Sequence, residues 1–143
     1  RSMEHSLHYL IMANQSLLHK KLLAGLKGTG LTIGQPKVLE YLSYHDGASQ
    51  IRIARACHIE AATLTSLLNR MEDKGLIQRR SLNGDRRTYY IFLTPQGHEM
   101  AQLVREQFLQ LEAQALQGIP PEEQAHLLDL LTRISEHLME ENG

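Results

Sequence analysis

The sequence has little of several features that would identify a class of protein. A single cysteine, Cys57, excludes an intramolecular disulfide framework and is typical of a reducing compartment. No uninterrupted apolar run approaches the length of about 18 residues that a membrane-spanning helix needs, and no secretory signal is recognisable. We therefore expect a cytoplasmic protein with no membrane partner.

Motifs of catalysis and nucleotide binding are also missing. The chain contains no G-x-S-x-G, no P-loop, no H-E-x-x-H and no dinucleotide fingerprint. Gly28 and Gly30 form a lone G-x-G with no strand before it, so we interpret it as a linker. These absences predict a protein that is not an enzyme and that needs no cofactor.

Charge is distributed unevenly along the 143 residues, although the net charge is only −1. Residues 1–48 hold five basic and three acidic groups, and residues 49–94 hold eight basic and four acidic ones. Residues 95–143 hold two arginines and nine acidic groups. A basic middle segment favours contact with phosphate, but chance clustering on a solvated surface explains the charge pattern equally well.

Apolar residues at helical spacing predict four helices before Gly75. The first covers residues 6–26 and ends in a glycine-containing turn, and the second covers 32–44 with Thr32 as its N-cap. The third and fourth follow as a closely spaced pair, which is the arrangement of a helix-turn-helix.

The third helix covers residues 49–57, with Ser49 as its N-cap and with Ile53 and Ala56 facing the core. The fourth covers 61–74, and Gly75 ends it. Its apolar row comprises Leu64, Leu67, Leu68 and Met71. The opposite face is small and polar near its start, as a helix that enters a DNA groove requires. That face includes Thr63, Thr65, Ser66, Asn69 and Arg70.

Two β-rich runs, 76–81 and 88–93, flank an Asn-Gly pair that is a strong hairpin signal. The hairpin tip carries Arg86 and Arg87, and Asp85 can hold a neighbouring arginine through a charge-assisted hydrogen bond. A helix pair followed by a basic hairpin predicts a winged helix-turn-helix whose tip reaches phosphate or the minor groove. In the alternative, the tip arginines are only solvated.

Two long helices are predicted at the C-terminal end, the first with Thr94 as N-cap and Pro95 in its first turn. Their apolar rows exceed what a small winged domain covers, so we expect a symmetric homodimer; the alternative is a monomeric bundle. The rows are Met100, Val104, Phe108, Leu111 and Ala115, then Leu127, Leu131, Ile134 and Leu138.

The predicted fold is therefore mainly α with a small β-hairpin wing and long terminal dimerisation helices. We divide it into an N-terminal dimerisation helix over 3–30, a winged helix-turn-helix over 31–94 and C-terminal dimerisation helices over 95–143.

Four segments in this order resemble the multiple-antibiotic-resistance regulator (MarR) family of winged-helix repressors and activators. They are residues 31–39, residues 68–79, the wing triplet Asp85-Arg86-Arg87, and residues 91–97. The resemblance implies a homodimer that binds pseudo-palindromic DNA. It implies that Asp85 buttresses the wing, that Arg87 enters the minor groove, and that the polar face of the fourth helix meets DNA. Ser66 departs from the family, many of whose members carry an arginine there.

We accordingly expect a sequence-specific DNA-binding transcriptional regulator, with repression the favoured mode. The alternative is a winged-helix module that docks protein without specific DNA binding. Salt discriminates the two, because binding through arginines to phosphate weakens steeply with ionic strength.

A regulator of this kind can sense an oxidant, a metal ion or a small organic molecule. Cys57 is interpreted as a core residue rather than a redox switch, and the eight histidines form no compact metal-ligand run, so no metal site is expected. The broadest alternative is a small organic effector. By resemblance to the family, binding of such a molecule causes the protein to release DNA. Its candidate pocket is lined by His8, Met12, Tyr41, Tyr44 and His45, which equally well only pack a helix junction.

Overall fold

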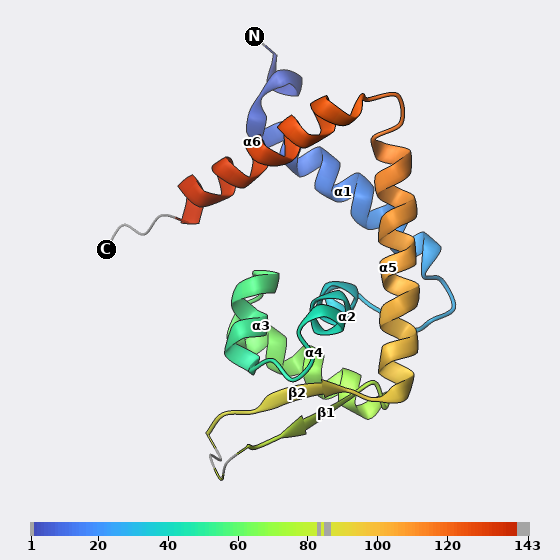
Figure 1. Ribbon diagram of the computed structural model, residues 1–143, viewed down its shortest axis with the longest axis vertical. Coiled ribbons are helices and arrows are strands. Elements are labelled where there is room, and N and C mark those ends of the chain that lie inside the picture. The colour runs from blue at the N-terminus through green and yellow to red at the C-terminus, as the bar shows by residue number, and fades with distance from the viewer. Residues whose placement is uncertain (1, 83, 85–86, 140–143) are drawn as a thin grey trace. The chain divides into compact units, whose positions relative to one another are not determined.

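The computed structural model describes residues 2–82, 84 and 87–139, and it comprises two compact units, Arg1–Leu111 and Glu112–Gly143. The first unit contains most of the elements, and the second contains the end of α5 and all of α6 (Figure 1). In chain order the elements are η1 (Met3–His5), α1 (Leu7–Gly25), α2 (Gln35–Tyr44), α3 (Gln50–Cys57), α4 (Ala61–Asp73), β1 (Ile77–Arg80), β2 (Tyr90–Leu93), α5 (Pro95–Ala115) and α6 (Pro121–Met139). This order confirms the predicted mainly α fold with a β-hairpin wing.

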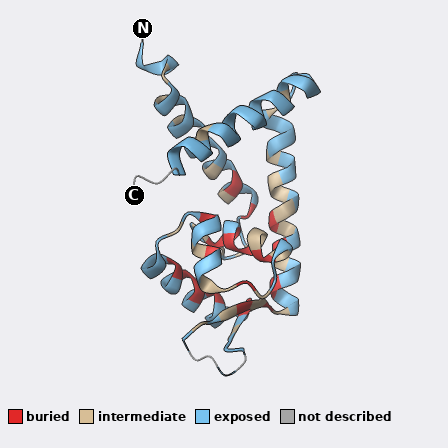
Figure 2. Cartoon of the chain, turned by 60° about the vertical axis from the view of Figure 1, so that its left-hand side comes forward, coloured by how far each residue is buried: buried red, intermediate tan, exposed pale blue. Residues whose placement is uncertain are grey.

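The hydrophobic core lies in the first unit, where α2, α3 and α4 pack with the sheet and the first turns of α5 (Figure 2). Each fully buried aliphatic side chain stabilises the fold by about 1.5–3 kcal/mol relative to an exposed one. The side chains with no exposed surface include Val38, Leu39, Leu42, Ile53, Leu64, Leu68, Met71, Ile91 and Val104. The apolar row predicted for α4 is buried throughout, so the outward face of this helix is fixed.

The sheet has two antiparallel strands, in which Ile77 pairs with Leu93 and Arg80 with Tyr90. Ile77 of β1 and Ile91 and Leu93 of β2 are buried, whereas the adjacent residues Gln78 and Phe92 are more exposed. One face of the hairpin therefore packs on the core and the other is open to solvent, as is usual for an antiparallel pair.

Helix ends agree with the predicted caps at two places and differ at a third. The Ser49 and Thr94 hydroxyl oxygens each accept a backbone N–H of the helix that follows, as predicted. However, α2 begins at Gln35 and not at Thr32. Gly34 is its N-cap and adopts a left-handed φ of 89°, which glycine tolerates without strain. The Thr32 N–H instead donates to the Gln35 side chain.

Cys57, not Ala56, packs beside Ile53 on the inner side of α3, which corrects the expected core position. The helical rotation of about 100° per residue brings position 57 within about 40° of position 53, and position 56 to about 60° on the other side. The Cys57 thiol lies 3.6 Å from the Lys37 carbonyl oxygen and is 8% exposed. Burial raises the pKa of this thiol, against a smaller opposing effect of the Lys37 ammonium.

The second unit contains the end of α5 and all of α6, and the leucines of α6 are not buried in a core. None of the described residues of α6 is buried within this chain, and five of its leucines are between 37% and 79% exposed. Over the described residues, no helix combines the length and the hydropathy needed to cross a bilayer. The leucines of α6 form an exposed apolar surface.

Gly97→Ala is expected to destabilise the chain by about 3 kcal/mol, because a Cβ atom there would lie 2.0 Å from the backbone oxygen of Leu76. Urea unfolding monitored by circular dichroism measures the effect. Gly25→Ala is the matched control. Its Cβ would meet only the movable end of the Gln107 side chain, so its unfolding free energy should change by less than about 1 kcal/mol. Equal stability of the two variants would contradict the close packing of α5 on the backbone of Leu76, the residue before β1.

Cys57 is expected to react with iodoacetamide far more slowly in the folded chain than in urea. Its thiol is buried and its raised pKa lowers the fraction present as the reactive thiolate. Mass spectrometry of timed samples at pH 8 measures the two rates. Equal rates in the two states would show that Cys57 is accessible.

Candidate nucleic-acid interface

α3 and α4 form a helix pair joined by a three-residue turn. His58 makes the turn, since it adopts a left-handed φ of 53° that reverses the chain after α3. Ile59 then donates its N–H to the Ala54 carbonyl, which satisfies an acceptor at the end of that helix. The second helix of such a pair is the element that reads base edges in the major groove.

The outward face of α4 is polar and exposed along its length. The five residues that the sequence assigned to it are all exposed: Thr63, Thr65, Ser66, Asn69 and Arg70. They therefore lie together on one surface, opposite the buried leucines. Arg70, Arg52 and Arg55 are exposed and form no ion pair with a described carboxylate, so their charges are available for phosphate.

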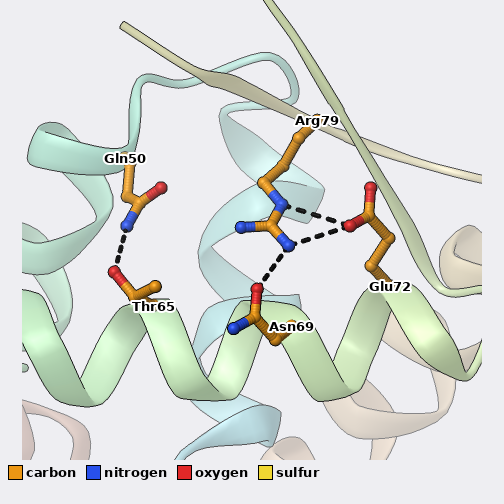
Figure 3. A network of polar contacts seen from close by, with 5 residues as sticks. All are labelled: Gln50, Thr65, Asn69, Glu72 and Arg79. Carbon is orange, nitrogen blue, oxygen red and sulfur yellow. Dashed lines mark hydrogen bonds and ion pairs between the residues drawn. The ribbon is translucent and has the colours of Figure 1, made fainter. Parts of the chain in front are cut away.

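A network of polar contacts ties this face to its neighbours (Figure 3). The Gln50 side-chain amide of α3 donates to the Thr65 hydroxyl oxygen at 2.8 Å. Arg79 of β1 donates to one carboxylate oxygen of Glu72 at 2.8 and 3.3 Å, and also to the amide oxygen of Asn69. α4 is thereby connected on one side to α3 and on the other to the wing.

Sequence reasoning did not single out Gln50, Glu72 or Arg79 as functional residues. Arg79 counted only as one basic residue of the middle segment. Its partners lie seven and ten positions earlier in the chain, on α4, so the turn after that helix separates them from β1. Only the packing of β1 beside α4 brings these side chains together, so the sequence carried no direct signal for the contact.

The wing is held by backbone bonds as well as by side chains. Residues 47–50, before and at the start of α3, pair with β2 and the residue before it. Gly47 N–H donates to the Ile91 carbonyl, Ile91 N–H to that of Ala48, and Gln50 N–H to that of Tyr89, at 2.8–3.0 Å. Residues 47–49, which precede α3, therefore lie beside the hairpin in the manner of a short third strand, and their hydrogen bonds tie the base of the wing to the helix pair.

The wing tip lies only partly within the described residues. Arg87 is exposed, as its expected contact with DNA requires. Asp85 and Arg86, the other two expected wing residues, lie outside the described residues. Arg80, at the end of β1, packs its guanidinium over the Phe92 ring at 4.3 Å, which holds its charge on the solvent side of the hairpin.

A hollow of about 440 Å³ lies between α3, α4 and the wing. Its walls combine aliphatic side chains with three arginines, so it is an electropositive notch in the candidate interface. It is lined by Gln50, Ile51, Ala54, Arg55, Ala61, Leu64, Thr65, Arg79, Arg87, Thr88 and Tyr89.

The structure brings together three of the five residues that the sequence assigned to an effector pocket. Tyr41, Tyr44 and His45 line a hollow of about 440 Å³ with Lys37, Glu40, Ala56 and Cys57. The Tyr41 and His45 rings stack with centroids 4.6 Å apart. His8 and Met12 are exposed on α1 and do not line this hollow.

A further hollow, which sequence reasoning missed, lies between α1, α2 and α5 and measures about 290 Å³. It is lined by Gln15, Leu18, His19, Leu22, Ile33, Gly34, Pro36, Lys37 and Phe108. Across the described part of the chain, no three His, Cys, Asp or Glu side chains gather closely enough to hold a metal ion.

Comparison with known sequences places the helix-turn-helix and wing in one family. The model of the MarR family matches residues 31–89. Over 91 residues the chain is 37% identical to the HTH-type transcriptional regulator PecS of Dickeya dadantii (strain 3937). That match covers 64% of this chain and 55% of PecS, so the chain spans little more than half of this relative.

Solved structures of regulators share the whole fold. MepR of S. aureus, in its DNA-binding conformation, is 27% identical with a TM-score of 0.85, over 94% of this chain and 99% of that chain. The transcriptional repressor CouR, bound to a 23-mer DNA duplex, has a TM-score of 0.82 at 23% identity, over 93% of this chain and 94% of that chain. Residues 31–89 thus match the MarR family of transcriptional regulators, and the helix pair, the wing and the order of elements agree with the fold of these structures.

Proposed function

We propose that this protein is a sequence-specific DNA-binding transcriptional regulator. The observation that carries the proposal is the exposed polar face of α4 beside a wing that is bonded to α3 and α4. A helix in the major groove and a wing at the adjacent groove need this fixed spacing, because each contacts a different part of the same duplex. The base-facing residues are Thr63, Thr65, Ser66, Asn69 and Arg70, and the wing residues are Asp85, Arg86 and Arg87.

The known relatives support a role in transcription. MepR and CouR, whose folds this chain shares, are described in a DNA-binding conformation and on a DNA duplex. PecS is a transcriptional regulator. We propose repression as the mode of regulation, because a protein that occupies an operator blocks access to that DNA. We also propose that the protein acts in the cytoplasm.

We further propose that the protein acts as a homodimer on a pseudo-palindromic operator. Segments 3–30 and 95–143 are its dimerisation regions, and 31–94 is its DNA-binding region. The exposed apolar side chains of α1 and α6 support this division, because a second copy of the chain would remove them from water in a symmetric interface. They include Leu7, Leu10, Ile11, Leu17 and Leu18 of α1 and Leu127, Leu128, Leu131 and Leu138 of α6.

A small organic effector is the third partner that we propose. The hollow beside Tyr41, Tyr44 and His45 combines stacked rings with the charged groups of Lys37 and Glu40, which suits an aromatic molecule that carries polar groups. The competing function, a winged-helix module that docks protein, predicts binding that depends little on salt. The free arginines of α3 and α4 favour DNA over that alternative.

Arg87→Ala is expected to weaken binding to the DNA upstream of this gene by about tenfold at 150 mM salt, because a wing–phosphate or minor-groove contact is lost. The slope of log K against log salt should fall by about one per wing. Fluorescence anisotropy across a salt series measures both quantities. Arg133→Ala, which removes the same charge from α6, is the control and should leave both unchanged. Equal weak binding of all proteins to this and unrelated DNA would refute the proposal.

Leu131→Glu is expected to convert the dimer to a monomer, since a carboxylate in the buried interface carries a large desolvation penalty. Sedimentation equilibrium at micromolar concentration measures the change. Arg133→Glu adds the same carboxylate about 200° further round α6 and should leave the dimer intact. Two dimeric variants would exclude this face of α6 from the interface.

A further inference from the structure

Two side chains on the outward face of α4 already have part of their hydrogen-bonding capacity in use (Figure 3). Asn69 bonds to Arg79, and Thr65 bonds to Gln50 and to the backbone. They are four residues apart and therefore lie on one face, one turn from each other. Only the hydrogen-bond donors and acceptors that are not already used within the protein are available to a base edge.

Asn69 can offer hydrogen-bond donors more readily than acceptors. Arginine has only donors, so the Asn69 amide must turn its oxygen toward Arg79 and its nitrogen away. No described residue accepts from that nitrogen. A free asparagine recognises adenine with both atoms, accepting from N6 and donating to N7. With one of its two oxygen lone pairs held by Arg79 and both amide N–H donors unused by described residues, Asn69 is better suited to guanine, whose N7 and O6 are both acceptors.

Thr65 has no hydroxyl hydrogen left to donate, so it can offer a base edge only its methyl group and one oxygen lone pair. Its hydroxyl hydrogen goes to the Ala61 carbonyl at 3.0 Å, and its oxygen accepts from the Gln50 amide at 2.8 Å. Because the single hydroxyl hydrogen is used, Gln50 must present its NH₂ group to one of the two oxygen lone pairs. The methyl group takes part in no hydrogen bond and suits the C5-methyl group of thymine.

Arg79 is held firmly enough to impose this arrangement. Its side chain is 19% exposed, and two of its nitrogens donate to Glu72, the residue one turn beyond Asn69 on the same helix. The ion pair anchors the guanidinium beside Asn69.

We propose that this network sets the base preference of α4, with Asn69 selecting guanine and Thr65 selecting thymine. The inference rests on the DNA binding proposed above. Arg79 and Gln50 act as positioning residues: each fixes which group a neighbouring side chain presents, and Arg79 does so from a strand of the wing.

Selection from a pool of random duplexes, followed by sequencing, tests the Asn69 assignment. Comparison with Asn69→Ala identifies the base pair that Asn69 contacts in each half-site. The wild-type chain should favour guanine over adenine there by about tenfold. In Arg79→Met the Asn69 oxygen is released, so adenine should become equal to or better than guanine. The matched control is Arg80→Met, which removes the same charge one residue along β1 and should keep the guanine preference.

The outcomes separate the two levels of the proposal. No enrichment of any sequence would refute the proposed function and the base preference with it. An enriched motif with adenine at the Asn69 position, or a guanine preference that survives in a folded Arg79→Met chain, would overturn the base preference alone. If Arg79→Met does not fold, the wild-type chain is measured on a site whose guanine is replaced by 7-deazaguanine. Loss of the N7 acceptor should weaken binding about tenfold, and unchanged affinity would overturn the assignment.

Thymine recognition is tested on the same selected site. Replacing the thymine beneath Thr65 by deoxyuridine removes only the C5-methyl group, and should weaken binding of the wild-type chain about fourfold, as expected for loss of one buried methyl contact. Thr65→Ser keeps the hydroxyl and lacks the methyl, so it should bind both duplexes equally. A fourfold loss that persists in Thr65→Ser, or no loss in the wild type, would overturn the Thr65 assignment.

Discussion

Burial of the apolar row of α4 is the constraint on which the candidate interface depends. Leu64, Leu68 and Met71 have no exposed surface, so rotation of the helix about its axis would bring aliphatic carbon into water. Removing even one such side chain from the core costs about 2–5 kcal/mol. The angle of the helix is therefore fixed by the core before any polar contact forms, and the polar residues on its other side necessarily share one surface. The wing then needs only to be placed at a constant distance from that surface.

The polar network adds definition to a surface whose position the core has set. Hydrogen bonds among partly exposed groups contribute about 0.5–1.5 kcal/mol each, and an exposed ion pair contributes less than about 1 kcal/mol. Contacts of this size contribute little to the total stability of a domain. They nevertheless select one orientation of an amide or hydroxyl from several. The leucines thus determine which residues face outward, and Gln50 and Arg79 determine which atoms those residues present.

Much of this architecture could be predicted from the sequence because it rests on local patterns. Spacing of leucines located α4 and its outward residues, and Ser49 and Thr94 were identified as caps from their positions before apolar rows. Predictions failed where the position of a helix end or a side-chain contact is not set by the local apolar pattern. The start of α2 moved to Gln35 because Gly34 adopts a left-handed turn, and the contact of Arg79 with Asn69 depends on how β1 packs beside α4. Three of the five effector residues line one hollow since Tyr41, Tyr44 and His45 are neighbours on α2 and at its end, whereas those on α1 lie elsewhere.

The backbone pairing of residues 47–50 with the segment 89–91 also affects how the molecule folds. It joins positions about forty residues apart, with the helix pair α3 and α4 in the intervening segment. Helices form from local contacts within about a microsecond, whereas pairing across such a distance must first close a long loop. During synthesis from the N-terminus, α3 and α4 leave the ribosome before the strand that secures them. The helix pair can thus acquire its secondary structure early, but the spacing between helix and wing is completed only when β2 arrives, and until then an unpaired strand edge is open to other chains.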